Sequence, residues 1–450
     1  MRKLNGKYLR LGSGAGFSSD RLEPAVDLVR DGALDYLVFE TIGERTLAFG
    51  HRDRLANPQR GYNPQLRARM IEVLPHAIAN GTRIVTNMGV ANVDAAADVV
   101  LDVANQLGLS GVTVATVHGD DVTDLMTPET PLFDYGNTPI RDVASKMICA
   151  NAYIGADAIR PALETDAQVI ITGRVADPSL FLAPLLHEFG WADDDWKMLG
   201  QGTAIGHLME CGMQITGGYF ADPGYKDVPD LANCGYPFAD VTADGSVTIS
   251  KLDGTGGCVS LQTVREQLLY EVHDPAAYIT PDVIADFSNV AINDHGANRV
   301  SVSGADGRPQ PEQLKVTVAF EAGLLAEAEV SYAGPGAINR ARLAQSVLRE
   351  RLERLVGDAG PIRIDLIGES ALHATAGTPR ATPSDVRVRV AQRTTDKAAA
   401  DMILWETEAL LCCGPAGGGG YRGRSTPSVV THSARVDRNS VKTHVQTRSN

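Results

Sequence analysis

Short apolar runs alternate with amphipathic segments through the first half of the chain. Five runs have the length and β-branched content of buried strands, and most are followed by apolar residues at helical spacing. The expected strands are residues 8–11, 36–39, 83–86, 112–117 and 168–171, and the expected helices are residues 21–30, 63–79, 93–107 and 156–164. Because parallel crossovers need helices, this alternation predicts a parallel sheet covered on both faces. We expect an open, doubly wound, Rossmann-like α/β sheet, with a barrel as the alternative.

The second half follows a different pattern. Residues 222–245 are rich in Pro, Gly and Asp, and the alternation of strand and helix stops there. Successive strands and two long helices follow, which is typical of an α+β domain. These strands are expected at residues 246–251, 283–292, 299–303, 315–320, 327–332, 362–367 and 386–391, and the helices at 337–355 and 397–411. The 450 residues suit two domains, and we place an α/β domain over 1–225 and an α+β domain over 240–450.

Polar side chains follow the expected strands of the first domain. In a parallel sheet the loops that leave the carboxyl ends of the strands meet at one edge, where sites commonly form. These loops carry residues that can ionise or form hydrogen bonds: Glu40, Asn87, His118, Asp120, Asp121 and Arg174. We therefore predict that these residues share one cleft.

The types of these residues indicate acid–base chemistry. Imidazole exchanges protons near neutral pH, and neighbouring carboxylates tune it or hold a divalent ion. Glu40, His118, Asp120 and Asp121 are therefore the predicted catalytic groups, although either aspartate could instead cap the next helix. Asn87 and Arg174 are expected to orient a carbonyl or carboxylate of the substrate.

A glycine-rich stretch follows the first expected strand. Gly12, Ser13 and Gly14 precede a helix, a context in which backbone N–H groups receive a phosphate or carboxylate, so we include them as substrate-binding residues. The spacing departs from G-x-G-x-x-G, and a tight turn is the alternative. The sequence carries no motif for NAD, FAD or zinc, so the cofactor stays unknown, and coenzyme A enters only as part of a possible substrate.

Composition excludes several classes of protein. A net charge of −14 argues against nucleic acid as a partner. The six cysteines form no disulfide framework, and no apolar stretch suits a membrane span, so we expect a cytoplasmic protein without a membrane anchor. Residues 375–450 carry a net charge of +5. This basic end is expected to dock on the acidic body or on an acidic partner, or to be a solvated surface.

Two further motifs leave alternatives open. His207 and Glu210 have the i, i+3 spacing of one helix face, and we interpret the histidine as a core or capping residue. The glycine-rich segment at 414–420 is either a linker after a helix or a loop that approaches a ligand.

Several long segments together resemble the acyclic terpene utilisation family, AtuA. They include GSGAGFSSDR, YLVFETIGERT, TNMGVANVDAAA, VHGDD and ITGRVADPSLFLAPLLHEFGW. The resemblance implies a cytoplasmic protein in the catabolism of branched or terpenoid acids as acyl-CoA thioesters, and it implies no particular reaction. The chain looks like the shorter form in this family, which accompanies a separate small protein.

We predict a non-redox acid–base enzyme, of the hydratase or dehydratase type, that acts on a branched or terpenoid carboxylic acid or its acyl-CoA thioester. The alternatives are a non-catalytic binding or scaffold subunit of an acyl-CoA catabolic complex and an oxidoreductase that uses a dinucleotide. The expected partners are further copies of the chain and a separate small subunit.

Overall fold

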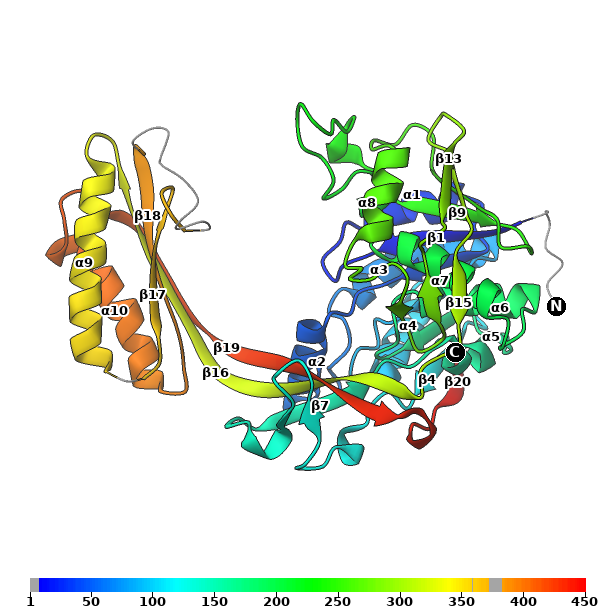
Figure 1. Ribbon diagram of the computed structural model, residues 1–450, viewed down its shortest axis with the longest axis horizontal. Coiled ribbons are helices and arrows are strands. Elements are labelled where there is room, and N and C mark those ends of the chain that lie inside the picture. The colour runs from blue at the N-terminus through cyan, green and yellow to red at the C-terminus, as the bar shows by residue number, and fades with distance from the viewer. Residues whose placement is uncertain (1–7, 358, 372–382) are drawn as a thin grey trace. The chain divides into compact units, whose positions relative to one another are not determined.

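The computed structural model describes residues 8–357, 359–371 and 383–450 (Figure 1). The chain divides into two compact units. The larger unit comprises Met1–Ala144, Ile148–Ala319 and Thr431–Asn450, and the smaller unit comprises Ser145–Met147 and Phe320–Val430. Each unit is described by itself below.

Five parallel strands form the centre of a ten-stranded sheet in the larger unit, in the order β1-β2-β3-β8-β4. They are β1 (Leu9–Ala15), β2 (Tyr36–Phe39), β3 (Arg83–Thr86), β8 (Val169–Thr172) and β4 (Thr113–His118). Their side chains are almost all buried, as expected for a sheet that is covered on both faces. All five strands expected from the sequence are therefore present.

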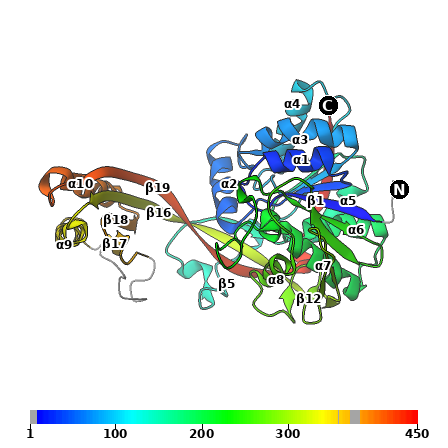
Figure 2. The ribbon, with the colours of Figure 1, turned by 90° about the horizontal axis from the view of Figure 1, so that it is seen from above.

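Helices cover both faces of this sheet (Figure 2). The chain steps from β1 to β2, β3 and β4 in one direction and then returns to β8, so right-handed crossovers place the helix between β4 and β8 on the opposite face. One face carries α1 (Glu23–Asp31), α3 (Leu66–Asn80) and α4 (Val93–Gln106), and the other carries α5 (Ala156–Leu163), α6 (Ser179–Phe189) and α7 (Trp196–Glu210). The protein is thus a mixed α/β structure, with a strand order that differs from the 3-2-1-4-5-6 order.

Antiparallel strands extend the sheet at both sides. Beyond β1 lie β9 (Pro237–Val241), β10 (Val247–Lys251), β14 (Val300–Ser303) and β13 (Ala291–Asp294), and beyond β4 lies β20 (His444–Ser449). The compact units therefore differ from the division expected near residues 225–240. The segment rich in Pro, Gly and Asp is a connection within the larger unit, because the strands that follow it pair with the open edge of β1 instead of starting a new core.

The basic C-terminus belongs to the larger unit. Strand β20 pairs with β4, and Arg448 forms ion pairs with Asp94 at 2.6 Å and Asp98 at 2.8 Å on α4. At Arg448 the basic end thus docks on the acidic body of the chain, rather than on an acidic partner or as a solvated surface.

The smaller unit is an α+β structure. It contains β17 (Ile362–Ile367), β18 (Asp385–Thr394) and parts of β16 (Gln313–Ala333) and β19 (Gly419–Asp437). Helices α9 (Ala337–Val356) and α10 (Lys397–Cys413) pack on β18 through a shared apolar core. Two strands expected at 315–320 and 327–332 are one continuous strand, β16. The glycine-rich segment at 414–420 joins α10 to β19.

The remaining elements are α2 (Glu44–Ala56), α8 (Leu261–Leu269), β5 (Pro131–Leu132), β6 (Thr138–Pro139), β7 (Met147–Ala152), β11 (Tyr278–Ile279), β12 (Ile284–Asp286) and β15 (Asp306–Arg308). Within the described part of the chain, no helix combines the length and the apolar character needed to cross a bilayer.

Candidate active site

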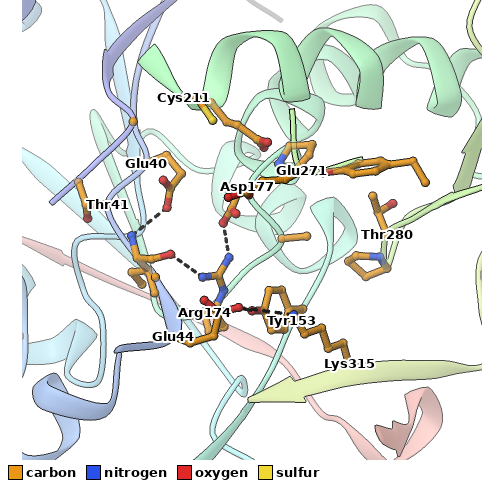
Figure 3. Close-up of a pocket in the computed structure, with 18 of the residues that line it drawn as sticks. Glu40, Thr41, Glu44, Tyr153, Arg174, Asp177, Cys211, Glu271, Thr280 and Lys315 are labelled. Atoms are coloured by element: carbon orange, nitrogen blue, oxygen red, sulfur yellow. Dashed lines mark hydrogen bonds and ion pairs between the residues drawn. The ribbon is translucent and has the colours of Figure 1, made fainter. Parts of the chain in front are cut away.

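A pocket of about 960 Å³ lies in the larger unit at the carboxyl ends of β2 and β8 (Figure 3). Its lining comes from the loop after β2, the loop after β8, the end of α7, and segments near β11 and the start of β16. Its place agrees with the general rule that ligands bind outside the carboxyl ends of parallel strands.

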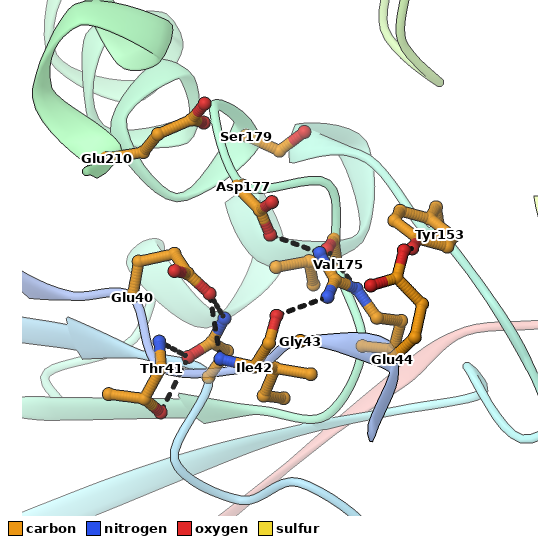
Figure 4. A network of polar contacts seen from close by, with 12 residues as sticks. Glu40, Thr41, Ile42, Gly43, Glu44, Tyr153, Val175, Asp177, Ser179 and Glu210 are labelled. Atoms are coloured by element: carbon orange, nitrogen blue, oxygen red, sulfur yellow. Dashed lines mark hydrogen bonds and ion pairs between the residues drawn. The ribbon is translucent and has the colours of Figure 1, made fainter. Parts of the chain in front are cut away.

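Glu40 is the first residue after β2 and is buried, with 8% of its surface exposed. Its Oε1 accepts hydrogen bonds from Asn87 Nδ2 at 2.9 Å and from the backbone N–H of Ile42 at 2.8 Å (Figure 4). Burial raises the pKa of Glu40 well above its usual range, and the nearby carboxylate of Asp177 adds to this. The carboxyl group is therefore held in one position and keeps its proton to a higher pH than an exposed glutamate.

Arg174 follows β8 and is almost completely buried. Its Nε donates to Val175 O at 2.8 Å, its Nη1 donates to Ile42 O at 2.6 Å, and its Nη2 donates to Asp177. Burial lowers the pKa of Arg174, but Asp177, Tyr153, Glu40 and Glu44 together outweigh burial and raise this pKa above its usual value. All three side-chain nitrogens thus bind protein acceptors. The structure makes Arg174 a positioning residue that joins two loops, where the sequence suggested direct contact with a substrate.

Glu44, at the start of α2, is the ionised counterpart of Glu40. Its Oε1 accepts a hydrogen bond from Tyr153 Oη at 2.7 Å and one from Lys315 Nζ at 3.4 Å. Burial raises the pKa of Glu44, but Tyr153, the backbone N–H of Glu44, Lys315 and Arg174 together outweigh burial and lower the pKa to about 2. Two carboxyl groups in one pocket therefore differ in charge because their surroundings differ.

Glu210 is the last residue of α7, and its carboxyl group also lines the pocket. Its Oε1 lies 2.9 Å from Nδ1 of His207, and burial raises the pKa of Glu210 well above its usual range, reinforced by Asp177 and Glu271. The His207 ring is buried beside the ring of Tyr278, with centroids 5.0 Å apart. The histidine is thus a core residue, as interpreted from the sequence, whereas its partner faces the pocket.

Replacing His207 by Asn tests this buried pair. Burial lowers the pKa of His207 to about 4, whereas an unfolded histidine titrates near 6.5. Stability from the neutral ring is therefore present above pH 6.5 and is lost as the pH falls towards 4, by about 3 kcal/mol. We expect the His207→Asn variant to lose most of this pH dependence in urea unfolding measured across that range. An unchanged slope would contradict the burial of a neutral ring.

His118, Asp120 and Asp121 line a separate cavity of about 200 Å³ in the larger unit. The His118 ring stacks on His444 with centroids 4.7 Å apart, and burial lowers the pKa of His118. Asp121 Oδ1 accepts bonds from Thr123 N at 3.1 Å and Oγ1 at 2.7 Å, which is a capping contact for the turn that follows.

Asp120 lines the smaller cavity and forms a hydrogen bond with the backbone of Arg174, which lines the larger pocket. Its Oδ2 accepts hydrogen bonds from the backbone N–H of Arg174 at 2.8 Å and from Asn151 Nδ2 at 2.9 Å. Burial raises the pKa of Asp120 to about 6. Asp120 thus supports the loop that carries Arg174 and does not line the larger pocket.

The structure therefore places Glu40 and Arg174 at the larger pocket, with Asn87 bonded to Glu40, and places His118, Asp120 and Asp121 at the smaller cavity. Asp120 contacts the first group through the N–H of Arg174. The reason for this separation is strand order. β8 lies between β3 and β4, so β2 and β4 are three strand spacings apart, or roughly 14 Å. The strands are predictable from local patterns in the sequence, but their order across the sheet is not.

Gly12, Ser13 and Gly14 lie inside β1, where the sequence suggested a turn that binds an anion. A Cβ atom at Gly12 would lie 2.6 Å from Leu34, and one at Gly14 would lie 2.6 Å from Phe39. These glycines therefore give room for packing side chains. Only the end of the motif, Gly16 and Phe17, reaches the pocket.

Several residues that line the pocket are not among the site residues predicted from the sequence. They are Glu44, Tyr153, Asp177, Glu271 and Lys315. Asp177 lies in the same loop as Arg174, and Glu44 is the first residue of helix α2, directly after the loop that carries Glu40, so both lie within four residues of a predicted site residue. Tyr153 and Lys315 follow or belong to strands β7 and β16, whose positions beside the pocket no local pattern reveals.

The described residues contain no group of three or more His, Cys, Asp or Glu side chains arranged to hold a metal ion. The polar side chains that line the larger pocket include carboxyl groups, the guanidinium groups of Arg45 and Arg174, tyrosine hydroxyls, the Cys211 thiol and the Lys315 ammonium.

Comparison with known proteins gives one match. The family model described as acyclic terpene utilisation family protein AtuA matches residues 9–447, which is nearly the whole chain. No curated protein and no solved structure matches the chain.

Proposed function

The chain belongs to the acyclic terpene utilisation family, AtuA, and from that premise we propose that it is a non-redox acid–base enzyme of catabolism in the cytoplasm. The proposed reaction is a hydration or dehydration of a branched or terpenoid carboxylic acid or of its acyl-CoA thioester. One observation carries the proposal: two buried carboxyl groups with raised pKa values, Glu40 and Glu210, line the same pocket.

A dehydration needs one group that removes a proton from carbon and one that protonates the departing hydroxyl. Burial and Asp177 raise the pKa of Glu40, so it acts as the base only after losing its proton, and Arg174, Asn87 and the Ile42 N–H favour that carboxylate form. Glu210 has the surroundings of the acid, because burial and the carboxyl groups of Asp177 and Glu271 favour its protonated form. The proton from carbon passes to Glu40, the proton of Glu210 leaves with the hydroxyl as water, and hydration is the reverse.

Solvent exchange tests this proposal. The protein is incubated in D₂O with branched unsaturated acids and, separately, with their CoA thioesters, and the products are followed by mass spectrometry. We expect deuterium to enter at carbon together with the elements of water. Failure of every acid and thioester to exchange would favour a non-catalytic binding subunit, and oxidation of NAD(P)H would favour an oxidoreductase.

We also propose that the chain forms a homo-oligomer and binds a separate small subunit. Light scattering at micromolar concentration is expected to give a mass above 47.9 kDa. When the chain is coexpressed with the proposed small subunit, the two proteins should elute in one peak in gel filtration at moderate salt. A monomer in the first experiment, or separate elution in the second, would contradict the corresponding part of the proposal.

A further inference from the structure

Glu40 uses only one of its two carboxyl oxygens for hydrogen bonds with the protein. Its Oε1 accepts the backbone N–H of Ile42 at 2.8 Å and Nδ2 of Asn87 at 2.9 Å. Its Oε2 accepts no hydrogen bond from any residue that the structure describes. A carboxylate oxygen has two lone pairs, so these two N–H groups occupy both lone pairs of Oε1. Oε2 is therefore the oxygen that is left for a ligand in the pocket.

The proton of neutral Glu40 follows the same division. If Oε1 carried the proton, one of its two N–H partners would lose its acceptor inside a buried site, which is costly. A proton on Oε2 leaves both hydrogen bonds intact. Neutral Glu40 thus has its O–H group at Oε2, and ionised Glu40 takes a proton back at the same oxygen.

Asn87 holds Oε1 with an amide group whose orientation is fixed. It follows β3 and is completely buried, and its Oδ1 accepts the backbone N–H of Thr41 at 2.8 Å and Thr41 Oγ1 at 3.2 Å. Because a backbone N–H can only donate, the amide oxygen must face Thr41 and the amide nitrogen must face Glu40. Figure 4 shows Glu40, Thr41 and Ile42 together in the loop after β2. Asn87 thus ties this loop to the end of the neighbouring strand.

Asn87 also differs from the role that the sequence suggested for it. We expected it to orient a carbonyl or carboxylate of the substrate, but Asn87 has no exposed surface and lies outside the lining of the larger pocket. Its donor reaches Glu40 instead, where it favours the carboxylate form against the effect of burial. Any effect of Asn87 on the reaction therefore passes through Glu40.

We propose that Asn87 is a positioning residue that holds Oε1 of Glu40 and so makes Oε2 the oxygen that exchanges a proton with the substrate. This inference rests on the proposed function, because it gives Asn87 a place in that reaction. The hydrogen bond of Asn87 also sets the pH above which Glu40 acts as a base.

The variant Asn87→Asp tests the proposal by solvent exchange in D₂O. It keeps an acceptor for Thr41 but places a second carboxyl group where Glu40 had a donor, and two adjacent carboxyl groups do not ionise together readily. The probes are 3-methylbut-2-enoic acid and its CoA thioester. We expect half-maximal exchange to need a pH at least about one unit higher, and the maximal rate to fall at least about tenfold. KM should stay within about twofold, because Asn87 does not contact substrate.

The matched control is Asn92→Asp. Asn92 is also buried, with 8% of its surface exposed, and its Oδ1 accepts the N–H of Ala95 at 3.2 Å at the start of α4. Its Nδ2 donates to Pro58 O and Arg60 O, and it forms no hydrogen bond with Glu40. The same substitution there is expected to affect stability while leaving the pH dependence and the maximal rate of exchange as in the unaltered protein.

Infrared difference spectroscopy at about pH 6 tests the contact without any substrate. The C=O group of neutral Glu40 is the one that contains Oε1, and a C=O group that accepts fewer hydrogen bonds stretches at a higher frequency. The Glu40 band is the protonated-carboxyl band that disappears in Glu40→Gln. We expect it to move to higher wavenumber in Asn87→Ala and to stay in place in Asn92→Ala.

Three results would overturn the proposal: a Glu40 band that is absent or does not move in Asn87→Ala, an Asn87→Asp variant with the pH dependence of Asn92→Asp, or a change in KM alone. The proposed function fails separately. If the band moves but neither probe exchanges in the unaltered protein, the acid–base reaction is wrong, whereas the division of Glu40 into a held and an unbound oxygen stands.

Discussion

Replacing Glu210 by Gln is expected to reduce turnover at least about 100-fold while making the folded protein more stable at neutral pH. Burial raises the pKa of Glu210 well above its value in the unfolded chain. Stability is then greatest below the unfolded pKa and is lost as the pH rises through the folded-state pKa, at about 1.4 kcal/mol for each unit of difference. Gln removes this loss and keeps an oxygen for His207. Urea unfolding of both proteins between about pH 4 and 8 measures this loss of stability with pH.

The matched control is the same substitution at Glu44, where the expected change in stability at neutral pH has the opposite sign. The pKa of Glu44 is lowered to about 2, so its carboxylate stabilises the fold above the unfolded pKa of 4.5, and this contribution is lost as the pH falls towards 2. Glu44→Gln should therefore destabilise the protein at neutral pH by about 1 kcal/mol, after allowance for solvent screening of this half-exposed group. If both variants shift stability in the same direction, the assignment of protons in the pocket is wrong.

The second large effect is expected at Arg174. Replacing it by Met leaves the buried Asp177 without its ion-pair partner and removes the donors to Ile42 O and Val175 O. We expect a loss of about 3–5 kcal/mol, as for other buried ion pairs that lose one partner. Arg174→Lys keeps the charge but cannot reproduce the planar set of three donors, so it should lose both stability and turnover.

Thermal unfolding and turnover of the two Arg174 variants show whether Arg174 positions the two loops or contacts substrate. An exposed arginine, Arg45, lines the same pocket and provides the control, since Arg45→Met removes a cation without breaking a buried pair. An Arg174→Met variant that unfolds at the temperature of the unaltered protein would mean that Arg174 contacts substrate rather than positioning the loops.

The sequence predicted the central strands because buried parallel strands leave a local signal. Residues 36–39 and 83–86 are short apolar or β-branched runs, and the structure confirms both as β2 and β3. Pairing between distant strands leaves no such signal. Nothing local to residues 444–449 shows that they add to β4, and nothing near residue 237 shows that β9 pairs with β1.

The candidate site follows the same rule: residues with a local signal were predictable, and those brought in by distant segments were not. Glu40 and Arg174 were found because both follow strands, and the structure places both at the larger pocket. Glu210 carried a visible signal, its spacing from His207, but its role depends on burial by residues far away in sequence. His118 was grouped with Glu40 because only the fold reveals that β8 separates their strands.

The central claim is that Glu40 and Glu210 hold protons at a pH where exposed glutamates are ionised. Infrared difference spectroscopy at about pH 6 measures this directly, by comparing the protein with its Glu40→Gln and Glu210→Gln variants. The account predicts that the unaltered protein has a protonated-carboxyl band that each variant loses in part. A spectrum in which the variants lose only carboxylate bands would show that both groups are ionised, and it would contradict the account.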